Sequence, residues 1–558
     1  MTPQTQPIPG HTNQVRNNAG GYSFAKDTWQ RLEDFLILGT TGGTYYAGER
    51  ALTTDNVGVL FEAIAKDGPR VVQLIVDIST AKPPRAPKPG PAIFALAAAH
   101  VRGDQETRGT ARRAVPLVCR TTDHLAKWFG YRKQLSGKAS VRGGASPVMG
   151  ASTRRALTLW FLEGTAEEVA FRACKAMQRK TPAGESFQLR DALRLAHPHR
   201  RQFRTPELSA KLLEPGRQTL LGWIAGTIPD DVARDELVTV DKFLTAKAVT
   251  NVKQAVRVVV EQRVPWEFLP SELLREPEVW DALVDTVGLT ALLRNLARMT
   301  RLGTLRPMGD ATRRAVARLT DRDALVRARI HPMDAFLALR VYGSGRSQPN
   351  PRAAAHTWAP VPAVLDALEE TYELSFGSVE PSGRRLLVAV DSSGSMSGGW
   401  YGRAVEVGGS MIGTPYEVGC AMAVMLARIE KGNAHVIDVD ISVHRSRVTP
   451  RTNLREIRSW RPSGGGTDLS LPFTWAAGER LAVDGFVVLT DSESWAGRSH
   501  PSQALESYRR TTSAQARVVV AAMTPAGHTI GDPGDAGVLN MAGLDASLPM
   551  VVNGFLRQ

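Results

Sequence analysis

Apolar side chains recur every three or four positions along the chain up to about residue 375, which is the spacing of an amphipathic α-helix. Many of these segments end at glycine or run into proline-rich stretches, as helices do. A short amphipathic helix buries its apolar face only against a neighbour, so a succession of them predicts stacked helical pairs of the HEAT or armadillo kind. The segments with this pattern are 29–39, 56–68, 70–80, 92–103, 110–121, 167–180, 190–197, 270–303, 311–330 and 331–345.

The pattern changes after residue 375, where short runs rich in Val, Leu and Ile alternate with helical segments. Buried strands that alternate with helices are typical of a parallel doubly wound sheet, whose ligands bind at the carboxyl ends of the strands. An apolar helix is predicted between the first two strands, over 416–432. The predicted strands are 385–390, 435–441, 486–492 and 517–524.

These two patterns divide the chain into three parts. We predict a disordered arm over 1–12, a mainly α, HEAT-like helical-repeat domain over 13–375, and an α/β doubly wound domain over 376–558. The apolar runs are well short of the roughly 18 residues of a membrane span, and the first residues lack the pattern of a secretory leader. The three cysteines are too scattered for a disulfide framework or a thiolate zinc site. We therefore expect a cytoplasmic protein without membrane contact.

The charge of the chain is unevenly distributed. The total is +14, from 69 Lys and Arg against 55 Asp and Glu. Residues 371–558 hold 17 basic and 18 acidic residues, so residues 1–370 hold 52 and 37, an excess of +15. Such asymmetry favours a polyanionic partner bound by the N-terminal part, although an Arg-rich solvated surface without a partner gives the same count.

Oxygen-bearing side chains gather where the predicted strands end. Asp391, Ser393 and Ser395 follow the first strand in the stretch DSSGS, Thr467 lies in the glycine-rich stretch SGGGTD, and Asp491 ends a later strand. Each of these alone is also common at strand ends and helix caps. Together they form an all-oxygen set that selects Mg²⁺, with Mn²⁺ and Ca²⁺ also compatible, over zinc.

A catalytic interpretation of these serines finds little support in the sequence. A serine becomes a good nucleophile only beside a base, and the chain has no G-x-S-x-G elbow and no histidine at a predicted strand end. His444 falls in ISVHRSRV, which reads as a surface strand or loop. We therefore predict a binding protein rather than an enzyme.

The order of these ligands resembles the metal-ion-dependent adhesion site of von Willebrand factor A domains, which carry DxSxS, then a threonine, then an aspartate. The resemblance implies that Asp391, Ser393, Ser395, Thr467 and Asp491 hold one divalent cation, some of them through water. It also implies that the cation keeps a coordination position for a carboxylate of a partner, so that the site recognises and does not catalyse.

The N-terminal part resembles the TROVE module of the Ro autoantigen family. The resemblance is carried by AGGY at 19–22 and GGTYY at 42–46, and it continues through CRTTDHLAKWFGYRK, ASTRRALTLWF, CKAMQRK, RDALRLAH and VPAVLDALEETYELSFGSVEPSGRR, up to the A domain. It covers the chain from about 13 to 555. The stretches KASVRGGASPVMG and HPHRRQFRTPELSAKLLEPGRQ depart from the family pattern, so the rim of the ring is expected to differ there.

The Ro resemblance implies a monomeric ring of helical repeats, closed by the A domain, that binds RNA. Small noncoding Y-like RNA would bind on the outer basic surface, and the single-stranded 3′ ends of misfolded RNA would enter the central channel for quality control or decay. An exoribonuclease tethered through the RNA is a further implied partner. The matching RNA-contacting positions are Lys175, Arg179 and His197, with Arg154, Arg155, Arg132 and Lys133 as neighbours.

The chemistry of these residues suits that role, because cations four apart on a helix share a face that can follow a phosphate backbone. Without the resemblance, each would be assigned to a solvated helix face. The rival hypothesis is a metal-dependent protein-binding module in which the helical half is an assembly scaffold. RNA binding should weaken steeply with salt, whereas adhesion should fail when Asp391 is replaced or the metal is chelated.

Overall fold

The structure is a computed structural model. It describes the chain apart from residues 18–19, 39–53, 82–88, 140–149, 179–188, 199–205, 348–354, 380, 398–404, 408–409, 513–514, 524–527, 543–547 and 558. Among the residues it describes, no helix is both long and apolar enough to cross a membrane.

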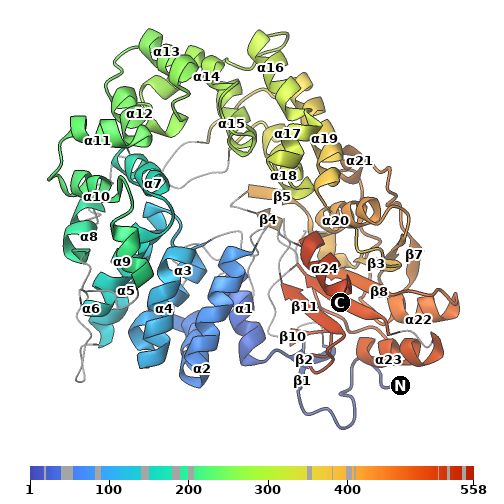
Figure 1. Cartoon of the computed structure of the whole chain (residues 1–558). Coiled ribbons are helices and arrows are strands. Elements are labelled where there is room, and N and C mark those ends of the chain that lie inside the picture. Colours follow the sequence, from blue (N-terminus) through green and yellow to red (C-terminus); the bar gives the residue numbers. More distant parts are fainter. Residues whose placement is uncertain are drawn as a thin grey trace.

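The described helices of the first 375 residues follow one another around a ring (Figure 1). Neighbours pack in an alternating manner, with α2 on α4, α3 on α5 and α4 on α6, as in stacked helical repeats. The helices are α1 (Thr28–Leu38), α2 (Thr54–Thr80), α3 (Gly90–Arg102), α4 (Gln105–Val118), α5 (Thr122–Ala139), α6 (Ala151–Leu162), α7 (Ala166–Gln178), α8 (Leu189–Ala196), α9 (Pro206–Leu212), α10 (Arg217–Ala225), α11 (Asp230–Glu236), α12 (Val238–Lys247), α13 (Val252–Gln262), α14 (Pro277–Leu283), α15 (Leu289–Arg301), α16 (Asp310–Leu319), α17 (Arg322–Arg327), α18 (Pro332–Gly343) and α19 (Pro362–Ser375).

The element α2 spans the two segments that the sequence pattern separates, 56–68 and 70–80, with a break between them. The backbone leaves helical geometry at Asp67, with φ −160° and ψ 84°, and Pro69 follows within the same element. Proline removes a backbone donor and clashes with the preceding turn, so it kinks a helix. The break at Asp67 therefore separates two helices, as the sequence pattern predicts for 56–68 and 70–80, and both bury an apolar face, with Leu60 and Ile75 fully buried.

A six-stranded sheet forms the core of the C-terminal domain, in the order β11-β9-β8-β3-β6-β7. All neighbours are parallel except the edge strand β7, which runs antiparallel to β6. The predicted doubly wound sheet is thus confirmed, with one antiparallel edge. The strands are β3 (Leu386–Asp391), β6 (Ala434–Val439), β7 (Val443–Arg445), β8 (Gly485–Thr490), β9 (Arg517–Ala522) and β11 (Val538–Ala542); a separate hairpin pairs β4 (Val405–Val407) with β5 (Ser410–Gly413).

Alternate residues of β3 point to opposite faces of the sheet. Leu386 and Val388 pack into the core that holds α20 (Pro415–Ile429) and α24 (Leu548–Arg557) and that continues into the helical ring. Leu387 and Ala389 pack into a second core. That second core holds α22 (Leu471–Gly478) and α23 (Pro501–Thr512), while the short α21 (Leu454–Ile457) lies beside α20. Both faces of the central strand β3 are therefore buried. This packing holds Asp391, the last residue of the strand, in a fixed position at the edge of the sheet.

The ring closes through the N-terminal residues. Strands β1 (Gln14–Arg16), β2 (Tyr22–Ala25) and β10 (His528–Thr529) form an antiparallel sheet, so the start of the chain pairs with the C-terminal domain. Both termini accordingly lie beside that domain in Figure 1.

The predicted disordered arm over 1–12 is corrected by the structure. Gln4 is fully buried and Ile8 is 6 % exposed. The Gln4 amide donates to the Asp468 carboxylate at 2.8 Å and to the Ser499 carbonyl at 2.9 Å, and it accepts from the Ser494 hydroxyl at 2.6 Å. The segment is polar and aperiodic, so its order comes from partners more than 450 residues away that local sequence does not indicate.

Candidate metal site and RNA-binding surface

Asp391 ends β3 with its side chain fully buried at the carboxyl edge of the sheet. One carboxylate oxygen accepts a hydrogen bond from the Ser393 N–H at 2.9 Å, and the other accepts one from the Thr490 hydroxyl at 2.6 Å. The Ser393 and Ser395 hydroxyl oxygens lie 3.2 Å apart, and the Ser395 hydroxyl hydrogen bonds to the Asp491 carboxylate. The structure therefore brings together both aspartates and both serines.

The glycine-rich loop that carries Thr467 packs against the loop after β3. The Gly464 N–H donates to the Ser392 carbonyl at 2.9 Å. Gly464 and Gly465 have φ of 84° and 93°, a conformation that glycine adopts without steric cost. Thr467 is 3 % exposed, and its carbonyl accepts from the Trp495 N–H at 2.9 Å. This loop is therefore held between the loops that follow β3 and β8.

Hydrogen bonds from Ser393, Thr490 and Ser395 offset only part of the cost of burying the two aspartates of this site. Burial, and then the nearby charge of Asp491, raise the pKa of Asp391 from 3.8 to about 7. Burial also raises the pKa of Asp491. Two buried carboxylates held close together are stabilised by a bound cation, so the site fits a divalent metal.

The chemistry of the donors narrows the kind of metal. Among the described residues, no group of three or more His, Cys, Asp and Glu is placed to hold an ion. A cation at Asp391 and Asp491 would therefore depend on the Ser and Thr hydroxyls as well, which suits a hard ion such as Mg²⁺.

Two residues beside this site were not predicted from the sequence. Thr490 precedes Asp491, and its hydroxyl donates to the Asp391 carboxylate. Its position at a strand end could have indicated that it belongs to the site. Asp440 follows β6 and is 5 % exposed; its carboxylate accepts from the Ser442 N–H at 2.8 Å and lies 2.9 Å from a ring nitrogen of His444. Asp440 thus holds the end of the sheet in shape.

Lys175, predicted to contact RNA, lies on α7 and already has an acidic partner. Its ammonium nitrogen is 3.1 Å from a Glu267 carboxylate oxygen, with the two side chains 34 % and 19 % exposed. Arg179 lies outside the described residues. His197 is exposed just after α8, with φ of 45°. The structure therefore leaves two of these three positions near the surface, one of them ion-paired.

The neighbouring candidates divide by helix face. Arg154 and Arg155 are exposed on the first turns of α6, and Lys133 is exposed on α5. Arg132 is only 1 % exposed, so the prediction that it contacts RNA is corrected. Its guanidinium donates to a ring nitrogen of His100 at 2.9 Å. A rotation of about 100° per residue turns Arg132 inward and Lys133 outward.

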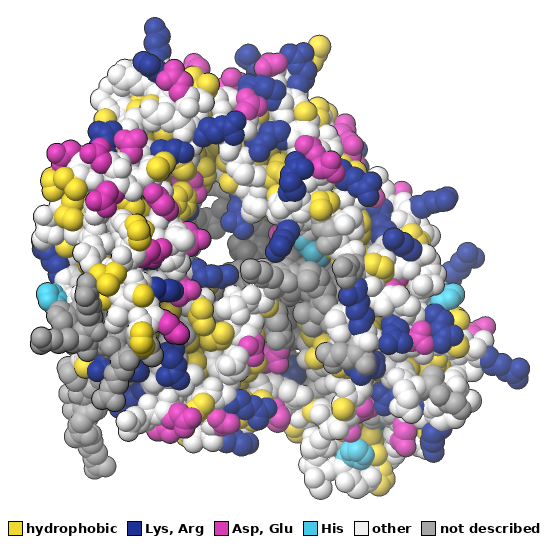
Figure 2. All heavy atoms as spheres, in the orientation of Figure 1, with side chains coloured by type: hydrophobic (Ala, Val, Ile, Leu, Met, Phe, Trp, Pro, Cys, Tyr) yellow, Lys and Arg dark blue, Asp and Glu magenta, His cyan; other side chains and the backbone are white. Residues whose placement is uncertain are grey.

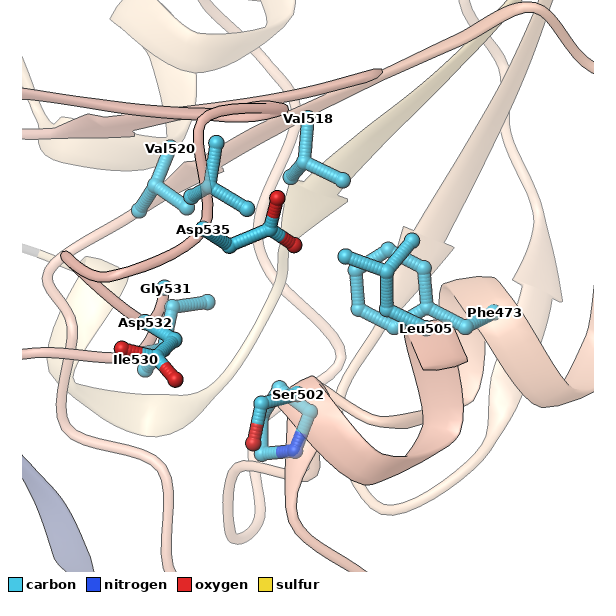
Figure 3. Close-up of a pocket in the computed structure, with 11 residues that line it drawn as sticks. Phe473, Ser502, Leu505, Val518, Val520, Ile530, Gly531, Asp532 and Asp535 are labelled. Atoms are coloured by element: carbon cyan, nitrogen blue, oxygen red, sulfur yellow. The ribbon is translucent and has the colours of Figure 1, made fainter. Parts of the chain in front are cut away.

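A separate pocket lies on the C-terminal domain between α22, α23 and the strands β9 to β11 (Figure 3). Apolar side chains such as Phe473, Leu505 and Val518 line it, with Asp532 and Asp535 at one side. The Asp535 carboxylate accepts a hydrogen bond from Arg509. None of the predicted site residues lines this pocket, so it is distinct from the metal and RNA candidates.

Comparison with known proteins links both halves of the chain to one family. The family model of the TROVE domain matches residues 248–345, and that of the Ro60 vWA domain matches residues 385–556. The RNA-binding protein RO60 of Deinococcus radiodurans is 34 % identical over 559 residues, covering 100 % of this chain and 97 % of that protein. The RNA-binding protein RO60 of Caenorhabditis elegans is 30 % identical over 608 residues, covering 97 % of this chain and 90 % of that protein.

The solved structures agree with this assignment. The crystal structure of the Deinococcus radiodurans RO (RSR) protein superposes with a TM-score of 0.69 at 32 % identity, covering 95 % of this chain and 99 % of that one. The likeness thus spans the helical ring, the sheet and their junction. The chain belongs to the Ro60 family, with a helical TROVE part and a von Willebrand factor A domain.

Proposed function

We propose that this chain is the RNA-binding scaffold of a ribonucleoprotein and not a catalyst. The observation that carries the proposal is the likeness, over the full length of the chain, to a relative named as an RNA-binding protein. Small structured noncoding RNA of the Y type would bind the outer surface of the helical ring. Single-stranded 3′ ends of misfolded RNA would enter the central opening, where an exoribonuclease tethered through the RNA could reach them.

The charge distribution supports this role. The excess of +15 lies in residues 1–370, which form most of the ring. Arg154, Arg155 and Lys133 are exposed on neighbouring helices. Phosphate groups bound there would release counterions, which drives association of proteins with nucleic acids.

The shape supports the same role. Figure 2 shows an opening near the centre of the ring with Lys and Arg side chains beside it. A strand of RNA without partners is narrow enough to be held by electrostatic attraction along such a passage, whereas a folded RNA is not. The opening and the outer surface would therefore select different forms of RNA.

The A domain would hold one divalent cation, most suitably Mg²⁺, through Asp391, Ser393, Ser395, Thr467 and Asp491. When bound, the cation supplies positive charge that offsets the two buried carboxylates. Asp391 also accepts from Ser393 and Thr490, so it orients the loop after β3 whether or not it binds metal.

A second function, docking of a protein partner, has one observation in its favour. Ile441 and Trp495 are 58 % and 40 % exposed, and both lie against Gly466, in the loop that carries Thr467. Large apolar side chains exposed beside a site are typical of protein contact surfaces.

The experiment that tests the proposed function is crosslinking of RNA to the protein in its own cells, followed by sequencing. We expect a dominant small structured RNA that is lost in Lys175→Glu/Arg179→Glu. The matched control is Lys253→Glu/Arg257→Glu, which reverses two cations four apart on α13. No RNA enrichment over a basic control protein would overturn the proposal, and retention of RNA by the Lys175 variant would move its site elsewhere.

A further inference from the structure

The A domain contains one strongly basic segment that the overall charge hides. Residues 443–461 hold six arginines and one acid, Glu456, a balance of +5. Removing them from the 17 basic and 18 acidic residues of 371–558 leaves 11 and 17, a balance of −6. The positive charge of residues 371–558 is therefore concentrated in one segment, and the rest of this part of the chain has a net negative charge.

The local fold turns these arginines outward. Strand β7 is an edge strand. Helix α21 buries Leu454 and Ile457 against the domain, so the two residues between Leu454 and Ile457 face solvent. All six arginines of the segment are exposed. In Figure 2, Lys and Arg side chains stand out along the right-hand margin, where Figure 1 places β7 and α21.

One of the six arginines is neutralised within the protein. Arg455 lies 2.9 Å from the Asp366 carboxylate and also pairs with Glu369, both on α19 of the ring. This pair ties the A domain to the helical part. Arg455 is therefore structural and serves as an internal contrast.

The other five form no salt bridge with any described residue, and we call them the arginine strip: Arg445, Arg447, Arg451, Arg458 and Arg461. The Arg447 guanidinium lies 5.0 Å from the centroid of a Trp460 ring and donates to the Arg461 carbonyl at 3.3 Å. Arg461 donates to the carbonyls of Trp460 at 2.8 Å and Arg458 at 3.2 Å. Neutral groups therefore position Arg447 and Arg461, and none of these contacts offsets their charge.

The strip also reaches the helical ring. A guanidinium nitrogen of Arg458 lies 3.4 Å from where a Cβ would stand on Gly343, at the end of α18. Burial, and then the charge of Arg458, lower the pKa of the nearby Arg340 to about 10. Arg340 also lies 3.7 Å from the Glu417 carboxylate, which offsets part of this repulsion, and a bound polyanion would offset more of it.

We propose that the arginine strip is a second contact surface for the phosphate backbone of RNA, located on the A domain; this rests on the proposed function. Arginine forms paired hydrogen bonds to phosphate oxygens. Trp460 is 7 % exposed beneath Arg447, so it is not available to stack on a base. The strip therefore binds RNA without reading its sequence and anchors RNA that already contacts the ring.

Protection of the sheet edge does not account for the strip. Charged side chains on an edge strand prevent pairing with other chains, and Arg445 on β7 suits that purpose. Arg451, Arg458 and Arg461 lie beyond the strand, where they guard no unpaired edge. A contact surface explains all five.

The test compares two variants with the same change in charge. The strip variant is Arg445→Gln/Arg447→Gln/Arg451→Gln/Arg461→Gln. The control replaces four exposed arginines elsewhere on the domain, Arg384, Arg480, Arg498 and Arg510, by Gln. Binding of a labelled mixed-sequence RNA of about 20 nucleotides to the full chain is measured by anisotropy across a salt series.

We expect the strip variant to reduce the slope of log K against log[salt] by about 3, since each lost phosphate contact contributes about 0.7 for single strands. The same relation gives about 200-fold weaker binding at about 0.15 M salt. The control should change the slope by less than about 1. A second variant with Lys at the four strip positions keeps the charge and should retain most of the affinity, which separates loss of charge from loss of folding.

Each outcome decides between the hypotheses. If the strip and control variants bind RNA equally, the strip is not an RNA surface, while the proposed function stands. If the unaltered chain binds no RNA, the proposed function itself fails. If the unaltered chain binds vesicles containing phosphatidylserine, and the strip variant loses that binding but keeps its RNA affinity, the partner is an anionic membrane and the proposal is overturned.

Discussion

Neutralising Glu267 should strengthen RNA binding at Lys175. The two side chains are paired at 3.1 Å, so a phosphate that contacts Lys175 must either displace the carboxylate or lie close to it. A phosphate on the far side of the ammonium would stand about 6 Å from Glu267, where like charges repel by about 0.7 kcal/mol at a dielectric constant of about 80 and about 2.8 kcal/mol at about 20.

The lower part of that range applies, because the side chains are 34 % and 19 % exposed and salt screens them further. Glu267→Gln should therefore improve RNA binding by about 1 kcal/mol, or roughly fivefold, at low salt. The assay is fluorescence anisotropy with the recovered RNA at low and high salt, and the gain should fade as salt rises.

The matched control for this prediction is Glu261→Gln. Glu261 pairs with Arg257 at 3.0 Å on α13 and is 56 % exposed, so the substitution makes the same change in net charge. If Glu267→Gln binds RNA no better than Glu261→Gln, the gain comes from net charge alone and Lys175 is not at the interface. If it binds more weakly, the pair positions Lys175 for RNA and the reasoning above is refuted.

Three further predictions concern the A domain. Mg²⁺ should raise the melting temperature of the chain, and Asp391→Asn should abolish this response while stabilising the metal-free protein, as thermal unfolding with and without chelator will show. The raised pKa of Asp391 means that the metal-free folded state binds this proton more tightly than the unfolded state does, so this group adds stability as pH falls from about 7 toward 3.8. Because a proton and Mg²⁺ compete for the same carboxylate, the Mg²⁺ affinity measured by calorimetry should fall over the same pH range. Gln4→Ala removes three hydrogen bonds, two of them buried, and should cost about 2–3 kcal/mol, with faster hydrogen exchange around 494–499. Unchanged exchange would show that backbone bonds, such as the one from the Gln4 N–H to the Gly497 carbonyl, hold the segment without the side chain.

The sequence predicted the parts of this fold that depend on local pattern. Strand β3, which ends at Asp391, and strand β8, which ends at Thr490 just before Asp491, are found where their apolar runs are, because a central strand buried on both faces needs an unbroken run. The clustering of Asp391, Ser393 and Ser395 follows from the same geometry, since the carboxyl ends of parallel strands share one edge.

What the sequence did not predict depends on partners far along the chain. Lys175 meets Glu267 across 92 positions, and Gln4 meets Asp468 across 464. No periodicity records such pairs. The prediction that Arg132 contacts RNA was wrong for a different reason. Arg132 and Lys133 are adjacent in sequence and were assigned to one surface, although a helix turns adjacent residues to different sides.

The pairing of β2 with β10 has a consequence for the making of the protein. Ala25 pairs with His528, so 503 residues separate two positions that must meet before the ring closes. At synthesis rates of about 5–20 residues per second, the first strands wait about 25–100 s for their partner. During that interval β2 presents an unpaired edge, which is open to chaperones and to a second nascent chain. The ring therefore cannot close in this way until residue 529 has been made, and a chain released before that point remains open.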